Sequence, residues 1–280
     1  MPRAWSTAQP QPPQKQGEKP VTVLVTGFGP FLQQLPNNSS WEIASTLPAL
    51  LPATKDNPTP VHIHVYHEAV RVAYNQVVNL VPRLLPPANT MSPKPDIILH
   101  IGLAAGRTYY TLEEGAHGRG YGAIPDVDGE RFMDDLADAK FPHELFPPKL
   151  QTGFDTDDAL YKWKVNLGYE DPNPSEFIPL NEPDVRISPD AGNFMCGFIY
   201  YNSLAHYYDL AGDGRPVAFL HVPDLSESQE ELDTGREVTV ALIRALVASF
   251  KETGAKHKGD RNEEVVEGGS VRAGTDVNFA

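Results

Sequence analysis

Cysteine is nearly absent from this chain of 280 residues, which holds only one, Cys196. An intramolecular disulfide is therefore excluded, and stability cannot depend on an oxidising compartment. No apolar run approaches the roughly 18 residues typical of a membrane-spanning helix, and the first residues show no secretory pattern. Basic residues are few, 23 Lys and Arg against 37 Asp and Glu, which disfavours nucleic acid and anionic membranes as partners. We expect a cytoplasmic protein that binds neither.

The first hundred residues alternate between two kinds of pattern. Apolar and β-branched runs at 21–26, 61–66 and 96–101 predict buried strands,. Amphipathic segments at 41–47 and 69–85 predict helices between them,. The order β-α-β-α-β predicts an α/β fold with three layers, an open twisted sheet that is largely parallel, and helices on both faces. Sites in such sheets lie outside the carboxyl ends of strands.

Composition divides the chain into a single domain with two tails. Residues 1–19 are rich in Pro, Gln and Lys and predict a disordered tail,. Residues 20–254 are expected to form one α/β domain, and 255–280 are expected to be loose. Within the domain, 130–183 shows no clear periodicity and is expected to be an extended insertion,. Nothing in the sequence indicates the oligomeric state.

The second half of the domain places the single cysteine. A short strand is expected at 185–188, a strand at 217–221 and a helix at 231–251. Between the first two, turn residues lead into a long apolar run, which predicts a helix with Cys196 in its first turn,. Unpaired N–H groups and the positive end of the helix dipole favour the thiolate there.

Cys196 and His221 form the most informative pair of residues. A cysteine at a helix start and a histidine at the end of the next strand can meet above a sheet edge, where the imidazole can accept the thiol proton. Glu113 is a candidate for the group that orients the imidazole. Each residue also has a structural interpretation: a small buried apolar residue, a hydrogen-bonded core histidine and a solvated loop carboxylate.

Two other patterns, a pair of histidines and a glycine-rich loop, do not indicate a metal or cofactor site. His62 and His64 share one face of the strand at 61–66, but no third metal ligand is apparent beside them,. The glycines at 118, 120 and 122 lack the strand-to-helix setting of a dinucleotide loop,. We expect neither a metal nor a cofactor.

Four blocks carry a family resemblance, and together they span about residues 21–250. They are Thr26-Gly27-Phe28-Gly29-Pro30-Phe31 with Asn38 and Ser40-Trp41-Glu42, then 95–113, then Ala191-Gly192-Asn193-Phe194-Met195-Cys196, and Phe219-Leu220-His221-Val222-Pro223. In sequence and order these blocks resemble pyroglutamyl peptidase I, a family of cysteine peptidases also called pyrrolidone-carboxylate peptidases.

The resemblance implies removal of an N-terminal pyroglutamyl residue from peptides, so the expected partner is a peptide with a blocked N-terminus. It makes Cys196 the nucleophile, His221 the general base and acid, and Glu113 the partner of His221. It also implies that the rings of Phe28 and Phe31 enclose the pyrrolidone ring and that Asn38 and Leu103 line the same pocket. A small, flat, uncharged lactam suits aromatic faces and a few backbone hydrogen bonds.

Three positions depart from the family pattern. Leu103 stands where Gln is expected, Ala123 where Arg is expected near the oxyanion, and Gly197 where Asn is common. Loss of one oxyanion donor costs about 10²–10³ in rate. Two alternatives therefore stay open: a non-catalytic relative that binds a peptide end, and a hydrolase for a different small acyl or lactam group.

Overall fold

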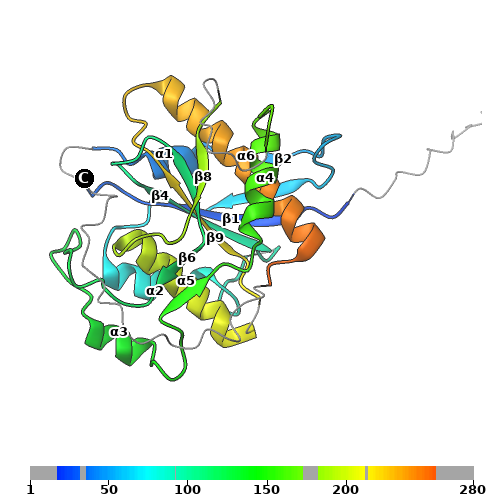
Figure 1. The fold of residues 1–280 in the computed structure, drawn as a ribbon. Coiled ribbons are helices and arrows are strands. Elements are labelled where there is room, and N and C mark those ends of the chain that lie inside the picture. The colour runs from blue at the N-terminus through cyan, green and yellow to red at the C-terminus, as the bar shows by residue number, and fades with distance from the viewer. Residues whose placement is uncertain (1–17, 32–35, 92, 173–181, 212–213, 257–280) are drawn as a thin grey trace, which may run out of the picture.

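The computed structural model describes residues 18–31, 36–91, 93–172, 182–211 and 214–256. Among them, a seven-stranded sheet has the order β2-β3-β1-β4-β9-β5-β8 (Figure 1). The strands are β1 (Val21–Gly27), β2 (Leu50–Leu51), β3 (Val61–Val65), β4 (Ile97–Leu103), β5 (Tyr110–Glu113), β8 (Val185–Ser188) and β9 (Val217–Val222). The neighbours from β3 to β9 are parallel, whereas β2 is antiparallel to β3 and β5 is antiparallel to β9.

Helices cover both faces of this sheet (Figure 1). One face carries α1 (Ser39–Ser45), α4 (Thr156–Asn166) and α6 (Gln229–Thr253), and the other carries α2 (Tyr74–Leu84) and α5 (Met195–Ala211). Outside α5 lie α3 (Asp134–Lys140) and a small ribbon of β6 (Gly115–His117) and β7 (Lys149–Gln151). The expected three-layer α/β fold with a largely parallel sheet is confirmed.

The alternation of side chains along β9 fixes which face holds the site. Val217 and Phe219 pack into the cluster under α2 and α5, whereas Leu220 and Val222 pack into the cluster under α6. Because side chains alternate along a strand, His221 lies on the same face as Phe219, toward α5. The strand is buried throughout, as its almost wholly apolar sequence predicts.

The expected helix at 69–85 is wrong in its first turn, because α2 begins only at Tyr74. Val70 instead extends the edge of β1: its N–H donates to the carbonyl of Gly27 at 2.8 Å, and its carbonyl accepts from Gly29 N at 2.9 Å. The helix then starts where Asp126 Oδ2 accepts from Tyr74 N at 2.9 Å. This cap comes from 52 residues further along the chain, so local periodicity does not show it.

The region expected to be an insertion contains regular structure. It includes α3, β7 and α4, and the Trp163 side chain anchors α4 by donating to the carbonyl of Val238 at 2.9 Å. Residues 173–181, like both predicted tails except for 18, 19, 255 and 256, lie outside the described residues. The division of the chain into one domain and two tails stays a prediction.

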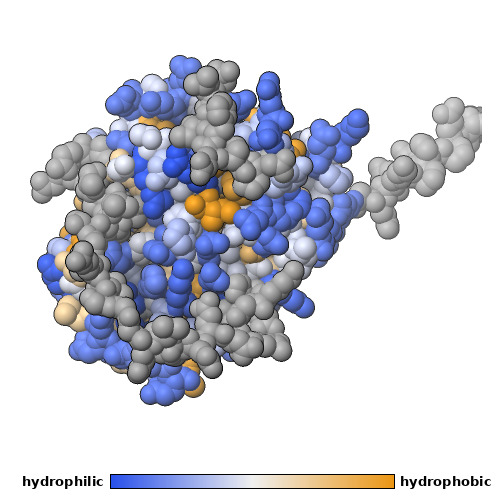
Figure 2. Space-filling view, in the orientation of Figure 1, coloured by the Kyte–Doolittle hydropathy of each residue, from blue (hydrophilic) through white to orange (hydrophobic). Residues whose placement is uncertain are grey.

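The surface in the orientation of Figure 1 is mostly hydrophilic, with a hydrophobic group near the centre of this face (Figure 2). In the described part of the chain, no helix combines the length and apolar character needed to cross a bilayer.

Candidate active site

The first turn of α5 holds Cys196 over the end of β4. Phe194 precedes the helix, and its carbonyl accepts from Phe198 N at 2.9 Å. Phenylalanine has no side-chain oxygen with which to cap the next N–H groups, so the helix leaves its first-turn amides without helical acceptors. Cys196 is half-buried. The predicted helix with Cys196 in its first turn is confirmed.

Gly102 in β4 provides the space for the sulfur. A Cβ atom at this position would lie 2.6 Å from Cys196 Sγ and 2.7 Å from Cζ of Phe219. Both distances are far below normal contact, so any side chain at 102 would displace the thiol or the ring. The missing Cβ of Gly102 is therefore what allows the sulfur to rest on the sheet.

The sheet register places His221 beside that sulfur. Gly102 and His221 are partners in the parallel β4–β9 pair, and such partners point to the same face with strands about 4.8 Å apart. The sulfur of Cys196 therefore lies above Gly102 of β4, and the imidazole projects on the same face from the paired residue of the neighbouring strand β9. The His221 side chain is fully buried, and its Nε2 has no hydrogen-bond partner among the described residues. Proximity is thus present, but no hydrogen bond joins the thiol to Nε2.

Glu113 reaches His221 from the other side. It ends β5, the strand antiparallel to β9, and its Oε1 lies 2.7 Å from His221 Nδ1. Both side chains are fully buried, so the alternative of a solvated loop carboxylate is wrong. With Nδ1–H donating to Glu113, Nε2 is the nitrogen left to accept a proton.

The surroundings of Glu113 favour its ionised form. Burial opposes ionisation, but the hydrogen bond and charge of His221, together with Ser188 and Arg107, outweigh it and lower the pKa of Glu113. An ionised carboxylate at this position keeps the imidazole oriented and stabilises its protonated form.

Arg107 and Thr111 also bind Glu113, and the sequence interpretation missed both. Arg107 Nη1 donates to Glu113 Oε1 at 2.8 Å, and Thr111 Oγ1 donates to the same oxygen at 2.7 Å. Thr111 and Glu113 lie two residues apart in β5 and so share a face,. Recognising residues 110–113 as a strand would have revealed that pairing.

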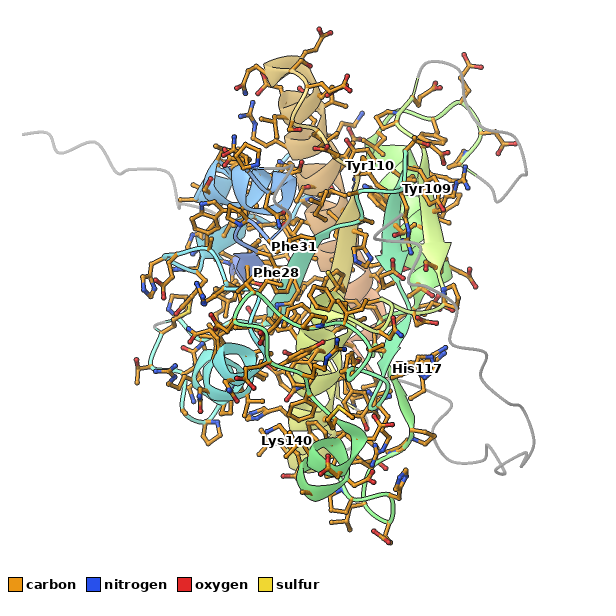
Figure 3. The ribbon with its side chains drawn as sticks, turned by 90° about the vertical axis from the view of Figure 1, so that its left-hand side faces the viewer. Phe28, Phe31, Tyr109, Tyr110, His117 and Lys140 are labelled. Carbon is orange, nitrogen blue, oxygen red and sulfur yellow. The ribbon has the colours of Figure 1, made fainter. Side chains whose placement is uncertain are left out.

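The two predicted ring residues follow β1 and lie close together (Figure 3). Phe28 is only 2% exposed and belongs to the core under α2 and α5. Phe31 is half-buried, and its centroid lies 6.0 Å from that of Phe194 at an interplanar angle of 44°. Phe194 is a further aromatic residue beside Phe31. The sequence places it in the block that contains Cys196, two positions before it, but does not indicate this ring contact.

Asn38 holds the turn that carries Phe31. Its Nδ2 donates to the carbonyl of Gly29 at 3.0 Å, and its Oδ1 accepts from Ser40 N at 3.0 Å and from Ser40 Oγ at 2.7 Å. The side chain is 1% exposed and caps α1. Leu103 is the last residue of β4, is 4% exposed and pairs with Val222.

The packing of the backbone around position 197 explains why a glycine stands there in this chain. A Cβ atom there would lie 1.9 Å from the carbonyl oxygen of Gly192 and 3.1 Å from the hydroxyl of Tyr121. The chain before α5 therefore packs against this position more closely than any side chain permits.

At Ala123, the exposed backbone carbonyl accepts from Arg131, which also donates to the carbonyl of Gly122 at 2.7 Å.

No group of three or more His, Cys, Asp or Glu side chains within the described ranges gathers in a way that could hold a metal ion. Cys196, His221 and Glu113 supply the three kinds of group, a thiol, an imidazole and a carboxylate bound to it, that nucleophilic catalysis by a cysteine requires,.

Comparison with known proteins bears on the family of this chain independently of the site geometry. The family model described as Pyroglutamyl peptidase matches residues 21–147. Pyroglutamyl-peptidase 1 of Rattus norvegicus is 30% identical over 230 residues, covering 82% of this chain and 91% of that protein. The Homo sapiens protein of the same name is 30% identical over 234 residues, covering 84% and 93%. A crystal structure of pyrrolidone carboxyl peptidase from Pyrococcus furiosus superposes with a TM-score of 0.59 at 22% identity, covering 81% of this chain and 99% of that one.

Proposed function

The chain belongs to the pyroglutamyl peptidase family, and we propose that it is a cysteine peptidase that removes the N-terminal pyroglutamyl residue from peptides. The observation that carries this proposal is the buried Glu113–His221 pair, which is joined at 2.7 Å. His221 lies on β9, whose neighbour β4 carries Gly102 beneath the Cys196 sulfur. The names of the relatives and the resemblance of the sequence blocks support the same activity.

The reaction runs through a thioester. His221 Nε2 accepts the proton of Cys196, and the sulfur attacks the carbonyl carbon that links the pyroglutamyl residue to the next amino acid. When the tetrahedral intermediate collapses, the C–N bond breaks and His221 returns the proton to the leaving amine. A water molecule, deprotonated by His221, then attacks the thioester. Free pyroglutamate leaves, and the sulfur regains its proton from His221.

The first turn of α5 supplies the electrostatic part of the reaction. Its backbone N–H groups lack helical acceptors, and the aligned peptide dipoles of this 17-residue helix place partial positive charge at the same end. Negative charge that develops on the carbonyl oxygen next to Cys196 is stabilised there. This donor set is made of backbone, so it does not depend on the arginine that Ala123 replaces.

Substrate recognition in this proposal is mainly apolar. In this proposal Phe31, which is half-buried, presents its ring to the lactam. The buried rings of Phe28 and Phe194 support it from the core, and Asn38 holds the turn that carries Phe31. Leu103 offers no hydrogen bond where the family pattern has Gln. We therefore expect binding to depend on ring stacking and on backbone hydrogen bonds.

The direct test is thiol-dependent cleavage of a fluorogenic pyroglutamyl amide. We expect the chain to release the fluorophore, and both iodoacetamide and Cys196→Ala to abolish release. His221→Gln is expected to lower kcat by at least about 10². The matched control is His143→Gln, since that histidine is 60% exposed and outside the site.

The two alternatives give different outcomes in the same assay. Rapid alkylation of Cys196 without release would favour a hydrolase for another acyl group. Slow alkylation without release would favour a non-catalytic relative. We also propose a cytoplasmic location, which the single cysteine supports, and which fractionation of cells that express the full-length protein would check.

A further inference from the structure

Three donors converge on one oxygen of Glu113. His221 Nδ1 and Thr111 Oγ1 each lie 2.7 Å from Oε1, and Arg107 Nη1 lies 2.8 Å from it. The Glu113 side chain is fully buried, and that of Arg107 is only 10% exposed. A carboxylate removed from water needs a compensating charge. Among the ion pairs of the described residues, Arg107 is the permanently charged partner of Glu113.

Arg107 is itself held in place from both ends. Its backbone N–H donates to the carbonyl of Ala104 at 2.9 Å, which fixes the turn after β4. Its Nη1 also reaches Thr111 Oγ1 at 2.5 Å. The guanidinium carbon lies 5.9 Å from the ring centroid of Tyr109, the residue that precedes β5 in Figure 3. The loop between β4 and β5 therefore presents a confined cation to the carboxylate.

We propose that Arg107, together with Thr111, is a positioning residue that keeps Glu113 ionised and aimed at His221. This inference rests on the proposed function, because it assigns Glu113 to the orientation of the catalytic imidazole. Arg107 touches neither the sulfur nor the substrate in this scheme. Its planar, delocalised cation can bind Glu113 and Thr111 at once, which a lysine ammonium on a flexible stem does less well.

A double-mutant cycle tests this role. We expect Arg107→Gln to lower kcat on the pyroglutamyl amide about 100-fold with KM changed less than about twofold, and Arg107→Lys to keep a larger share of kcat. In a Glu113→Gln background, Arg107→Gln is expected to cost almost nothing further, because its target is already lost. Arg186→Gln is the matched control: Arg186 lies 3.9 Å over the Tyr109 ring but pairs with Asp184.

Additive losses in the cycle, or an unchanged kcat in Arg107→Gln, would overturn the proposal. Denaturation curves of each variant establish that it is folded, and Arg107→Lys retains the charge if Arg107→Gln does not fold.

A second readout separates this inference from the proposed function. The proton on His221 Nδ1 should give a far-downfield NMR signal because it is bound to a buried carboxylate. We expect the signal in the unmodified chain and in Arg186→Gln, and its loss in Arg107→Gln. This result does not depend on whether the amide is cleaved. If the signal persists in Arg107→Gln, the positioning role is wrong even in an active enzyme.

Discussion

Replacing Gly102 with alanine tests where the Cys196 sulfur lies. The new Cβ would come 2.6 Å from Sγ, 2.7 Å from Cζ of Phe219 and 3.0 Å from its Cε1. Heavy atoms in contact settle at about 3.5–4.0 Å, so each contact is too short by roughly 1 Å. The Phe219 ring is fully buried in the core, whereas Cys196 is half-buried. The sulfur is therefore the atom that must move.

A displacement of this size has a large expected cost in rate. Misplacing a reacting atom by about 1 Å can lower activity roughly 10²-fold, which corresponds to about 2.7 kcal/mol of transition-state stabilisation. Overpacking a core costs about 1–3 kcal/mol of folding stability. Gly102→Ala should thus remain folded under mild conditions and lose about two orders of magnitude in kcat/KM.

Three measurements check this expectation: kcat/KM on a fluorogenic pyroglutamyl amide, the rate of iodoacetamide alkylation, and the urea midpoint. Alkylation is a clean readout because the chain has one cysteine. Gly214→Ala is the matched control, since no heavy atom of the described residues, its chain neighbours aside, lies within 4 Å of its Cβ position. If Gly102→Ala kept both the kcat/KM and the alkylation rate of the unmodified chain, the placement of the sulfur over β4 would be refuted.

Three further substitutions have defined outcomes. Gly197→Asn, which restores the residue common in the family, should destabilise the fold and lower activity, because its Cβ would lie 1.9 Å from a backbone oxygen; a urea midpoint equal to that of the unmodified chain would contradict this. His100 lies in β4 and is fully buried, and this burial lowers its pKa to about 3 from 6.5. As pH drops, the unfolded chain therefore protonates this histidine near pH 6.5, whereas the folded chain does so only near pH 3. The free energy of unfolding falls over that range, and the loss is about 2 kcal/mol at pH 5. In urea titrations at pH 7 and 5, His100→Gln should lose this component and His143→Gln should keep it. Asn38→Ala should raise KM more than it lowers kcat, because the carbonyl of Gly29 loses its donor and the Phe31 turn loosens; steady-state kinetics with an unchanged KM would count against that.

The central strands could be predicted from sequence because each is buried on both faces. The runs at 21–26 and 217–221 are almost wholly apolar or β-branched and end at turn or site residues. Their observed bounds, Val21–Gly27 and Val217–Val222, differ by one residue. The helix start at Cys196 was predictable for a similar reason, since turn residues precede a long apolar run.

Strand β5 could not be predicted, and with it the surroundings of Glu113. It is four residues long, too short for a periodic pattern to emerge. Its place between β9 and β8 depends on pairing with segments that are distant in sequence. From spacing alone Glu113 looked solvated, whereas the pairing buries it completely. Arg107 was missed for the same reason, because its role depends on which carboxylate the strand brings beside it.

The three proposed catalytic groups depend on three neighbouring strands. Glu113 comes from β5 and His221 from β9, and the sulfur rests above Gly102 of β4, which is the order of these strands in the sheet. The groups therefore follow the direction of the strand-to-strand hydrogen bonds, with a spacing of about 4.8 Å per strand. A shift of one residue in β5 would turn Glu113 to the α6 face and leave His221 Nδ1 without its carboxylate. The pairing of β5 with β9 and β8 thus sets the position of Glu113, and the loop between β4 and β5 places Arg107 beside it.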